Sequence, residues 1–137
     1  MANLYELYET DPELEKKGIG LQFGDTVFYV KRAGGANEAF DKCFEEKTRS
    51  MTSRLQLQAL SEEQSSRLMQ EVYFEAVMVG WKNVTDRTGA PMEYNRENFL
   101  KLMKDLPTVW RALRTEAANH ENFRRAQVAQ EGELLGN

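Results

Sequence analysis

Two short apolar segments separated by Gly24-Asp25 constrain the fold of this chain more than any other feature. The segments, residues 19–23 (IGLQF) and 26–30 (TVFYV), are rich in residues that favour β-strands. A two-residue connection that begins with glycine is typical of a tight β-hairpin. An isolated hairpin is only marginally stable in water, so this one must pack against other parts of the chain.

The two-residue turn also determines which side chains share a face of the hairpin. One face is apolar enough to be buried against helices, and carries Ile19, Leu21, Phe23, Thr26, Phe28 and Val30. The other face is mixed, and we expect partial exposure of Val27 and Tyr29 there. An apolar row on an edge strand suits strand addition or self-association, with packing in the core as the alternative. We therefore predict a self-association surface made of Gln22, Val27 and Tyr29.

The first half of the chain otherwise shows helical patterns. Residues 1–9 form a short amphipathic segment, and Thr10 or Asp11 can cap a helix that stops at Gly18. Asn37 can cap a further helix, predicted over residues 39–51. Residues 52–60 alternate between apolar and polar side chains, a pattern that fits either a strand or a loop.

The second half of the chain contains the strongest helical signal. Ser61 and Gln64 form a capping box that opens a helix predicted over residues 61–84. From Leu68 to Trp81 the pattern is apolar on most sides, as expected for a helix around which the others pack. Two further helices are predicted, over residues 96–106 and 108–130.

These elements predict an α+β fold that is predominantly α-helical. One small antiparallel β-hairpin near the N-terminus would pack on a bundle of about four helices. The chain of 137 residues is long enough for one globular domain, expected over residues 1–131. Gly132 would end the last helix, leaving residues 132–137 as a loose tail.

Composition argues against several functional classes. The net charge of −4 is divided evenly between the two halves of the chain, and no basic block is present, so nucleic-acid binding is not expected. The single cysteine, Cys43, and the single histidine, His120, leave no Cys/His set for zinc, and neither a metal nor a cofactor is expected. The lone cysteine fits a reducing cytoplasm, the N-terminal region does not resemble an export signal, and no apolar run is long enough to cross a bilayer, so we expect a cytoplasmic protein without a membrane segment.

The cluster from Asp86 to Asn95 is the strongest candidate for a chemical site. It lacks the alternating acidic ligands of a calcium loop, and the single Gly89 does not form a glycine-rich phosphate loop. No Ser/His/Asp set is present nearby for nucleophilic catalysis. Asp86 and Gly89 are typical turn residues and Asn95 is a typical helix cap, so we interpret the cluster as a joint. No catalytic residue is predicted, and an enzyme is not expected.

Other conspicuous side chains have simple structural interpretations. Cys43, beside Phe40 and Phe44, is predicted to be a small core residue rather than a reactive thiol. Trp81 and Trp110 are predicted to be packing anchors. From the residues alone, the chain is best interpreted as a small partner-binding or assembly protein.

An ordered series of short motifs resembles the tail assembly chaperones of lambda-like, long-tailed bacteriophages. The resemblance covers residues 10–125. Its parts are an early helix with Glu15-Lys16-Lys17-Gly18, the hairpin, Asn37 and Phe40, a long helix ending at Gly80-Trp81, Asp86-x-x-Gly89, Tyr94, Asn98, and a leucine-rich stretch before Pro107.

The resemblance implies a specific role. Such chaperones act on the tape measure protein, the long helical protein that sets tail length. They self-associate and coat it in the host cell cytoplasm until tail tube protein polymerises around it, and they are absent from the mature virion. Many exist in two forms, the longer made by a ribosomal frameshift, and this chain would correspond to the short form. The alternative is a structural neck or tail-completion protein that is retained in the virion.

Overall fold

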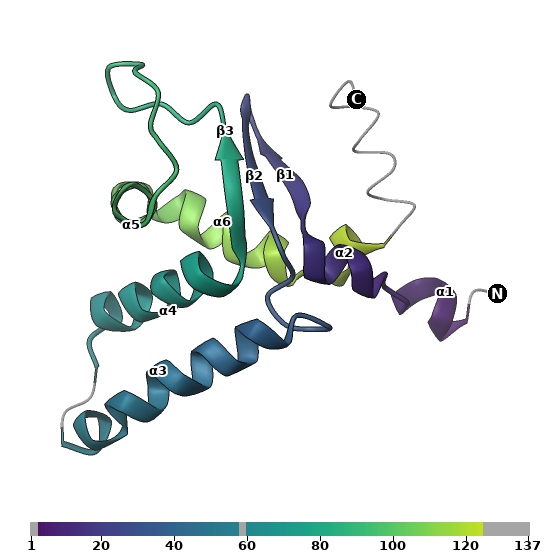
Figure 1. Cartoon of the computed structure of the whole chain (residues 1–137), viewed down its shortest axis with the longest axis horizontal. Helices are drawn as coiled ribbons and strands as arrows, with labels where there is room; N and C mark the ends of the chain where they lie inside the picture. The colour runs from purple at the N-terminus through teal and green to yellow at the C-terminus, as the bar shows by residue number, and fades with distance from the viewer. Residues whose placement is uncertain (1–2, 58–59, 125–137) are drawn as a thin grey trace.

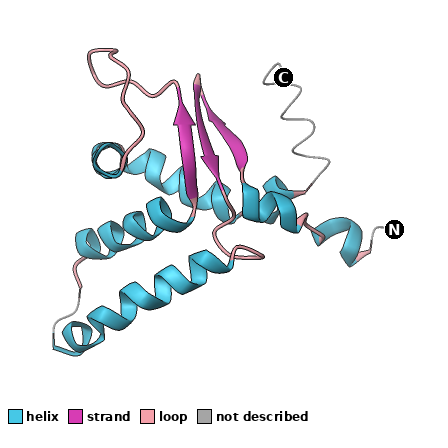
Figure 2. Cartoon of the chain, viewed as in Figure 1, coloured by secondary structure: helices cyan, strands magenta, loops and turns pink. Residues whose placement is uncertain are grey.

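The computed structural model describes residues 3–57 and 60–124 and has an α+β, mostly helical fold (Figure 2). The first half contains α1 (Leu4–Tyr8), α2 (Pro12–Lys17), β1 (Ile19–Phe23), β2 (Thr26–Val30) and α3 (Glu38–Leu57). The second half contains α4 (Glu62–Ala76), β3 (Met78–Lys82), α5 (Arg96–Asp105), α6 (Pro107–Ala118) and the 3-10 helix η1 (His120–Phe123).

The β1–β2 hairpin forms in the predicted register. Ile19 pairs with Val30 and Phe23 pairs with Thr26 across an antiparallel ladder. Gly24 has a φ of +63°, which an L-residue adopts only with strain, so glycine suits the first position of this turn. The apolar face of the hairpin is buried, as expected.

A third strand, β3, extends the hairpin into an antiparallel sheet of order β1-β2-β3. The prediction of one continuous helix over residues 61–84 was therefore wrong, because α4 ends at Ala76. Met78 to Lys82 instead pair with β2, and Val27 lies opposite Lys82. Pairing with β2 gives the backbone groups on one side of this apolar segment ladder hydrogen bonds, and places Trp81 against Phe28.

The core lies between the apolar face of the sheet and helices α4, α5 and α6 (Figure 1). Each of these helices contributes side chains that are almost completely buried, including Val77 at the end of α4, Phe99 on α5 and Leu113 on α6. Tyr73 of α4 packs edge-on against Trp110 of α6 at a ring-centroid distance of 5.0 Å. Helix α3 lies alongside α4, on the side away from α5 (Figure 1).

Local capping signals correctly located the ends of several helices. The Asp11 side chain accepts a hydrogen bond from the Glu13 amide at the start of α2, and Gly18 ends that helix. Ser61 and Gln64 form the reciprocal capping box of α4. The Asn95 side chain caps α5 by accepting from the Asn98 amide.

Two other boundaries differ from prediction. Helix α3 continues to Leu57, so residues 52–57 are helical rather than strand or loop, and residues 58–59 lie outside the described residues. Helix α6 ends at Ala118 instead of continuing to residue 130. The Asn119 side chain accepts from the Glu121 amide and starts η1, so a local cap redirects the chain. The predicted tail, residues 132–137, lies outside the described residues.

Candidate interaction surfaces

The N-terminal arm, defined as Leu4, Tyr5, Leu7 and Tyr8 on α1, is the most exposed apolar feature of the described chain. These four side chains are 72%, 76%, 45% and 58% exposed, respectively. Helix α1 lies at one end of the molecule, beyond α2 (Figure 1). Large exposed apolar patches on soluble proteins usually mark contacts with other proteins.

The arm is attached to the C-terminal part of the fold through its backbone. The guanidinium of Arg124 donates hydrogen bonds to the carbonyls of Glu6 and Leu7. The Asp11 amide donates to the Phe123 carbonyl at 2.9 Å. The Tyr8 ring contacts the imidazole of His120 at a centroid distance of 5.1 Å. These contacts fix the end of α1 that leads into α2, and the side chains at its start remain exposed.

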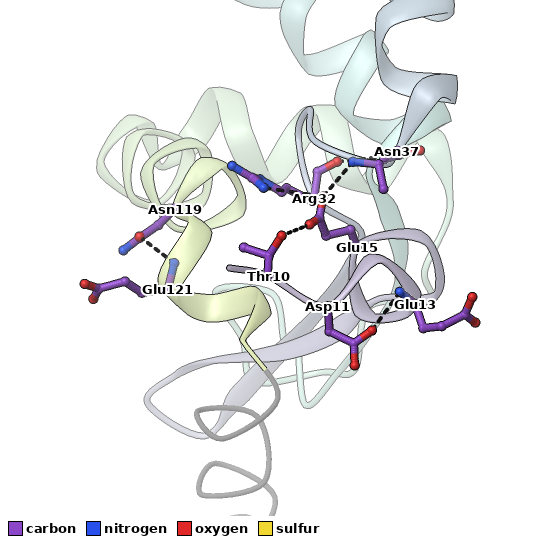
Figure 3. Close-up of polar contacts among 9 residues, drawn as sticks. Thr10, Asp11, Glu13, Glu15, Arg32, Asn37, Asn119 and Glu121 are labelled. Atoms are coloured by element: carbon purple, nitrogen blue, oxygen red, sulfur yellow. Dashed lines mark hydrogen bonds and ion pairs between the residues drawn. The ribbon is translucent and has the colours of Figure 1, made fainter. Parts of the chain in front are cut away.

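A buried polar junction around Glu15 holds α2, and the residues that connect it to α1, in place (Figure 3). The Glu15 carboxylate accepts hydrogen bonds from the Thr10 hydroxyl and from the Ala36 amide, the latter at 2.6 Å. The guanidinium of Arg32 lies 3.4 Å from the same carboxylate. The buried Asn37 side chain donates to the Arg32 carbonyl at 2.9 Å and so joins the junction to the rest of the fold.

No pattern in the sequence singles out Glu15 as buried. The nearest indication in the sequence is Gly34-Gly35, because two consecutive glycines suggest a place where another group packs closely against the backbone. Gly35 has a φ of +55°, and a Cβ there would overlap a Glu15 carboxylate oxygen. The glycine is thus required both for its backbone conformation and for the space that the carboxylate occupies.

A groove of about 710 Å³ lies between α4, α5 and α6. Its apolar lining comes from Leu68 of α4, Met103 of α5, and Pro107 and Trp110 of α6. Its charged lining consists of Glu63, Arg67, Glu71 and Lys104. We call this feature the α4–α6 groove. Its volume is within the range of roughly 300–1,000 Å³ that is typical of ligand-binding clefts.

The second face of the hairpin is less exposed than predicted. Val27 is only 3% exposed, so the expectation of its partial exposure was wrong. β2 is the central strand, and Val27 lies between Gln22 of β1 and Lys82 of β3 in the register. Tyr29 is 37% exposed, as expected, and Gln22 is also exposed. The assignment of these three residues to self-association stays a prediction.

The Asp86 cluster forms a tight turn, as predicted, although it connects β3 to α5 rather than two helices. The Asp86 carboxylate accepts from the Thr88 amide, the Thr88 hydroxyl and the Ala90 amide. These hydrogen bonds hold the pKa of Asp86 below its usual value, with the Thr88 hydroxyl as the largest cause. Gly89 has a φ of +87°, consistent with a turn that only glycine adopts easily.

Cys43 lies in the contact between α3 and α4 rather than in the core. Its thiol donates to a Glu75 carboxylate oxygen at 3.3 Å, and Lys47 pairs with the other oxygen at 3.0 Å. Burial, followed by the hydrogen bond to Glu75, raises the pKa of the thiol to about 11. A thiol with this pKa is protonated at neutral pH and is a poor nucleophile.

The two tryptophans are packing anchors, as predicted. The Trp81 indole N–H donates to the Met92 carbonyl at 3.0 Å, and its ring packs edge-on against Tyr94. Trp110 is 4% exposed, and Arg114 lies over its ring. Within residues 3–57 and 60–124, no group of three or more Cys, His, Asp or Glu side chains is arranged to hold a metal ion. No helix in the same residues is long and apolar enough to span a membrane.

The chain matches a known protein family. The family model described as YdaY prophage protein matches residues 35–133, which is well over half of the chain. The match extends from just before α3 to beyond η1, so the hairpin and the N-terminal arm lie outside it. No curated protein and no solved structure matches the chain.

Proposed function

The chain belongs to the YdaY prophage protein family and is phage-derived, and from this premise we propose that it is a phage tail assembly chaperone. In this role it self-associates and coats the tape measure protein in the host cell cytoplasm. The coat keeps this client soluble until the tail tube polymerises around it, and the chaperone does not enter the mature virion. The motif series between residues 10 and 125, which resembles such chaperones, supports this specific role.

The exposed N-terminal arm is the observation that carries the proposal. The core already contains the large side chains of the sheet and of α4 to α6, so it does not need the apolar residues of α1. Leaving four large apolar side chains in water is unfavourable by roughly 25 cal/mol for each square ångström that a partner could cover. A protein that assembles with other chains recovers this free energy on binding.

A second apolar surface lies at the other end of the molecule. The α4–α6 groove lies towards α5 and the start of α4, whereas α1 lies beyond α2 (Figure 1). Two separate surfaces suit a protein that contacts more than one neighbour. Coating a long client requires many weak, repeated contacts, which self-association makes effective through avidity.

The client contacts are expected on the helices. Helix α3 is the longest of the described helices and has an exposed aromatic side chain, Phe44, which is 39% exposed. A tape measure protein is itself helical, and helix-to-helix packing is a common mode of recognition. Tail tube protein and a frameshift-extended form of the chaperone are further partners under the same proposal.

Co-expression with the tape measure protein of the same prophage tests the function. We expect the tape measure protein to be soluble and to copurify with the chaperone, but to aggregate when expressed alone. A matched control replaces the chaperone with an unrelated acidic protein of similar size. An equally insoluble tape measure protein in the presence of the chaperone would contradict the proposal.

Mass spectrometry of purified virions addresses the fate of the protein. A chaperone should be missing from particles in which the tape measure and tail tube proteins are detected. Finding this chain in stoichiometric amounts would instead identify it as a neck or tail-completion protein.

A further inference from the structure

We propose that the N-terminal arm of one copy binds in the α4–α6 groove of a second copy. This inference rests on the proposed function, and it names the two surfaces through which copies of the chaperone would self-associate. It predicts which residues of the two copies meet, and it also predicts assembly into a ring or a filament.

The arm has the properties of an inserted segment. Its backbone is held by Arg124, while Leu4 and Tyr5 are more than two-thirds exposed. The Asn3 side chain caps the helix by accepting from the Glu6 amide at 3.0 Å, so the arm is already helical before binding. A preformed helix loses less conformational entropy on docking than a disordered segment does.

The α4–α6 groove has a size and lining that fit such a segment. Five helical residues are only about 7.5 Å long, at 1.5 Å per residue, so α1 presents a compact apolar surface. In the groove of about 710 Å³, the half-buried Leu68 and the exposed Pro107 are the accessible apolar contacts, because Met103 and Trp110 are buried. Placing an apolar helix face in an apolar groove between helices is an established mode of recognition.

Charge complementarity favours the arm as the occupant. Residues 3–9, which contain the arm, also include Glu6 and Glu9, and the chain has no basic residue before Lys16. At the groove, the acidic Glu71 is already neutralised by Arg96 and Arg67. Lys104 is exposed at the end of α5 and is available to an incoming carboxylate, although Glu63 also lines the groove.

The positions of the two surfaces exclude binding within one molecule. Helix α1 lies near one end of the longest axis of the chain, whereas α5 and the start of α4, which line the groove, lie towards the other end (Figure 1). A contact between different surfaces of two copies is heterologous, and it leaves one free arm and one free groove at the ends of each assembly. Such contacts produce a ring or a helical filament, and a filament can follow an elongated client.

Charge reversal with rescue tests the contact in solution. Glu6→Lys alone and Lys104→Glu alone should each shift self-association in sedimentation velocity to about tenfold higher concentration. An equimolar mixture of the two variants should recover association, because the arm of the Glu6→Lys chain then meets the groove of the Lys104→Glu chain with opposite charges. The matched control is Lys42→Glu on exposed α3, which should associate like the unmodified chain.

Site-specific cross-linking tests the proximity directly. In a Cys43→Ser background, a Leu7→Cys chain and a Lys104→Cys chain are mixed under mild oxidation. We expect a disulfide between the two chains, in excess over the mixture that pairs Leu7→Cys with Lys42→Cys. Cross-linking that does not exceed this control, or arm variants that associate like the unmodified chain, would overturn the proposal.

The two proposals fail separately. Sedimentation and cross-linking report only on the arm-to-groove contact. Solubility of the tape measure protein with the unmodified chain reports only on the chaperone function. Self-association through other residues would refute the contact and leave the function intact.

Discussion

The buried ion pair between Glu15 and Arg32 allows a quantitative prediction. Replacing Arg32 by methionine keeps the apolar part of the side chain and removes the positive charge. The Glu15 side chain is 3% exposed and cannot recover its hydration, whereas the Arg32 side chain is 22% exposed. Breaking a fully buried pair costs roughly 3–5 kcal/mol because a buried charge is left uncompensated.

Two features of the junction reduce this cost. Glu15 retains hydrogen bonds from Thr10 and from the Ala36 amide after Arg32 is lost. The buried Nε of Arg32 has no hydrogen-bond partner among the described residues, so its removal relieves an unsatisfied donor. We therefore expect Arg32→Met to lower the free energy of unfolding by about 2–3 kcal/mol, or the melting temperature by roughly 6–15 °C.

A double-mutant cycle with Glu15→Gln isolates the charge interaction. In the Glu15→Gln background, Arg32→Met should cost less than about 1 kcal/mol, because no buried charge remains. Urea unfolding at pH 7 gives all four free energies, and equal m-values would confirm that the denatured states are comparable. Additive single-variant effects, or an Arg32→Met chain within about 0.5 kcal/mol of the unmodified protein, would refute the reasoning.

The remaining predictions concern separate elements. Gly35→Ala should destabilise the fold by at least about 2 kcal/mol more than Gly24→Ala, since both have similar φ values but only Gly35 faces a carboxylate; equal losses in urea unfolding would contradict this. Cys43 should react with iodoacetamide at pH 8 about a hundredfold more slowly than an ordinary thiol, reflecting its raised pKa, and unfolding should abolish the difference. Asp86→Asn should lower the melting temperature at pH 7, because the folded state lowers the pKa of Asp86; the difference should shrink below about pH 4, and a pH-independent difference would argue against a charge effect. Val27→Ala should cost about 2 kcal/mol in urea unfolding, whereas an exposed Val27 would give a loss near zero.

Features decided by neighbouring residues could be predicted from the sequence. The hairpin register followed from a two-residue turn with Gly24 in its first position. The caps at Asp11, Ser61 and Asn95 followed from side chains that bond amides two or three residues later. In each case the interacting groups are close in sequence, so no knowledge of distant contacts was needed.

Features decided by distant contacts were missed. The segment of β3 follows α4 without a turn signal, and its apolar pattern fits a buried helix as well as a strand. Pairing with β2, about 50 residues earlier in the chain, decides between them. The same pairing makes β2 central and buries Val27, which a two-stranded hairpin would have left partly exposed. Glu15 was missed because its burial depends on Arg32 and Ala36, beyond the hairpin.

Because the two ends of the described chain contact each other, α1 can be attached to the rest of the fold only late in translation. Asp11 bonds to Phe123, and Arg124 bonds to the carbonyls of Glu6 and Leu7, so α1 has no place to attach until residue 124 has been made. At roughly 5–20 residues per second, the ribosome needs about 6–23 s to add the intervening residues. Throughout this interval the apolar residues of α1 lack the contacts that anchor the helix in the folded chain. The anchoring of α1 is therefore among the last steps in building this part of the fold.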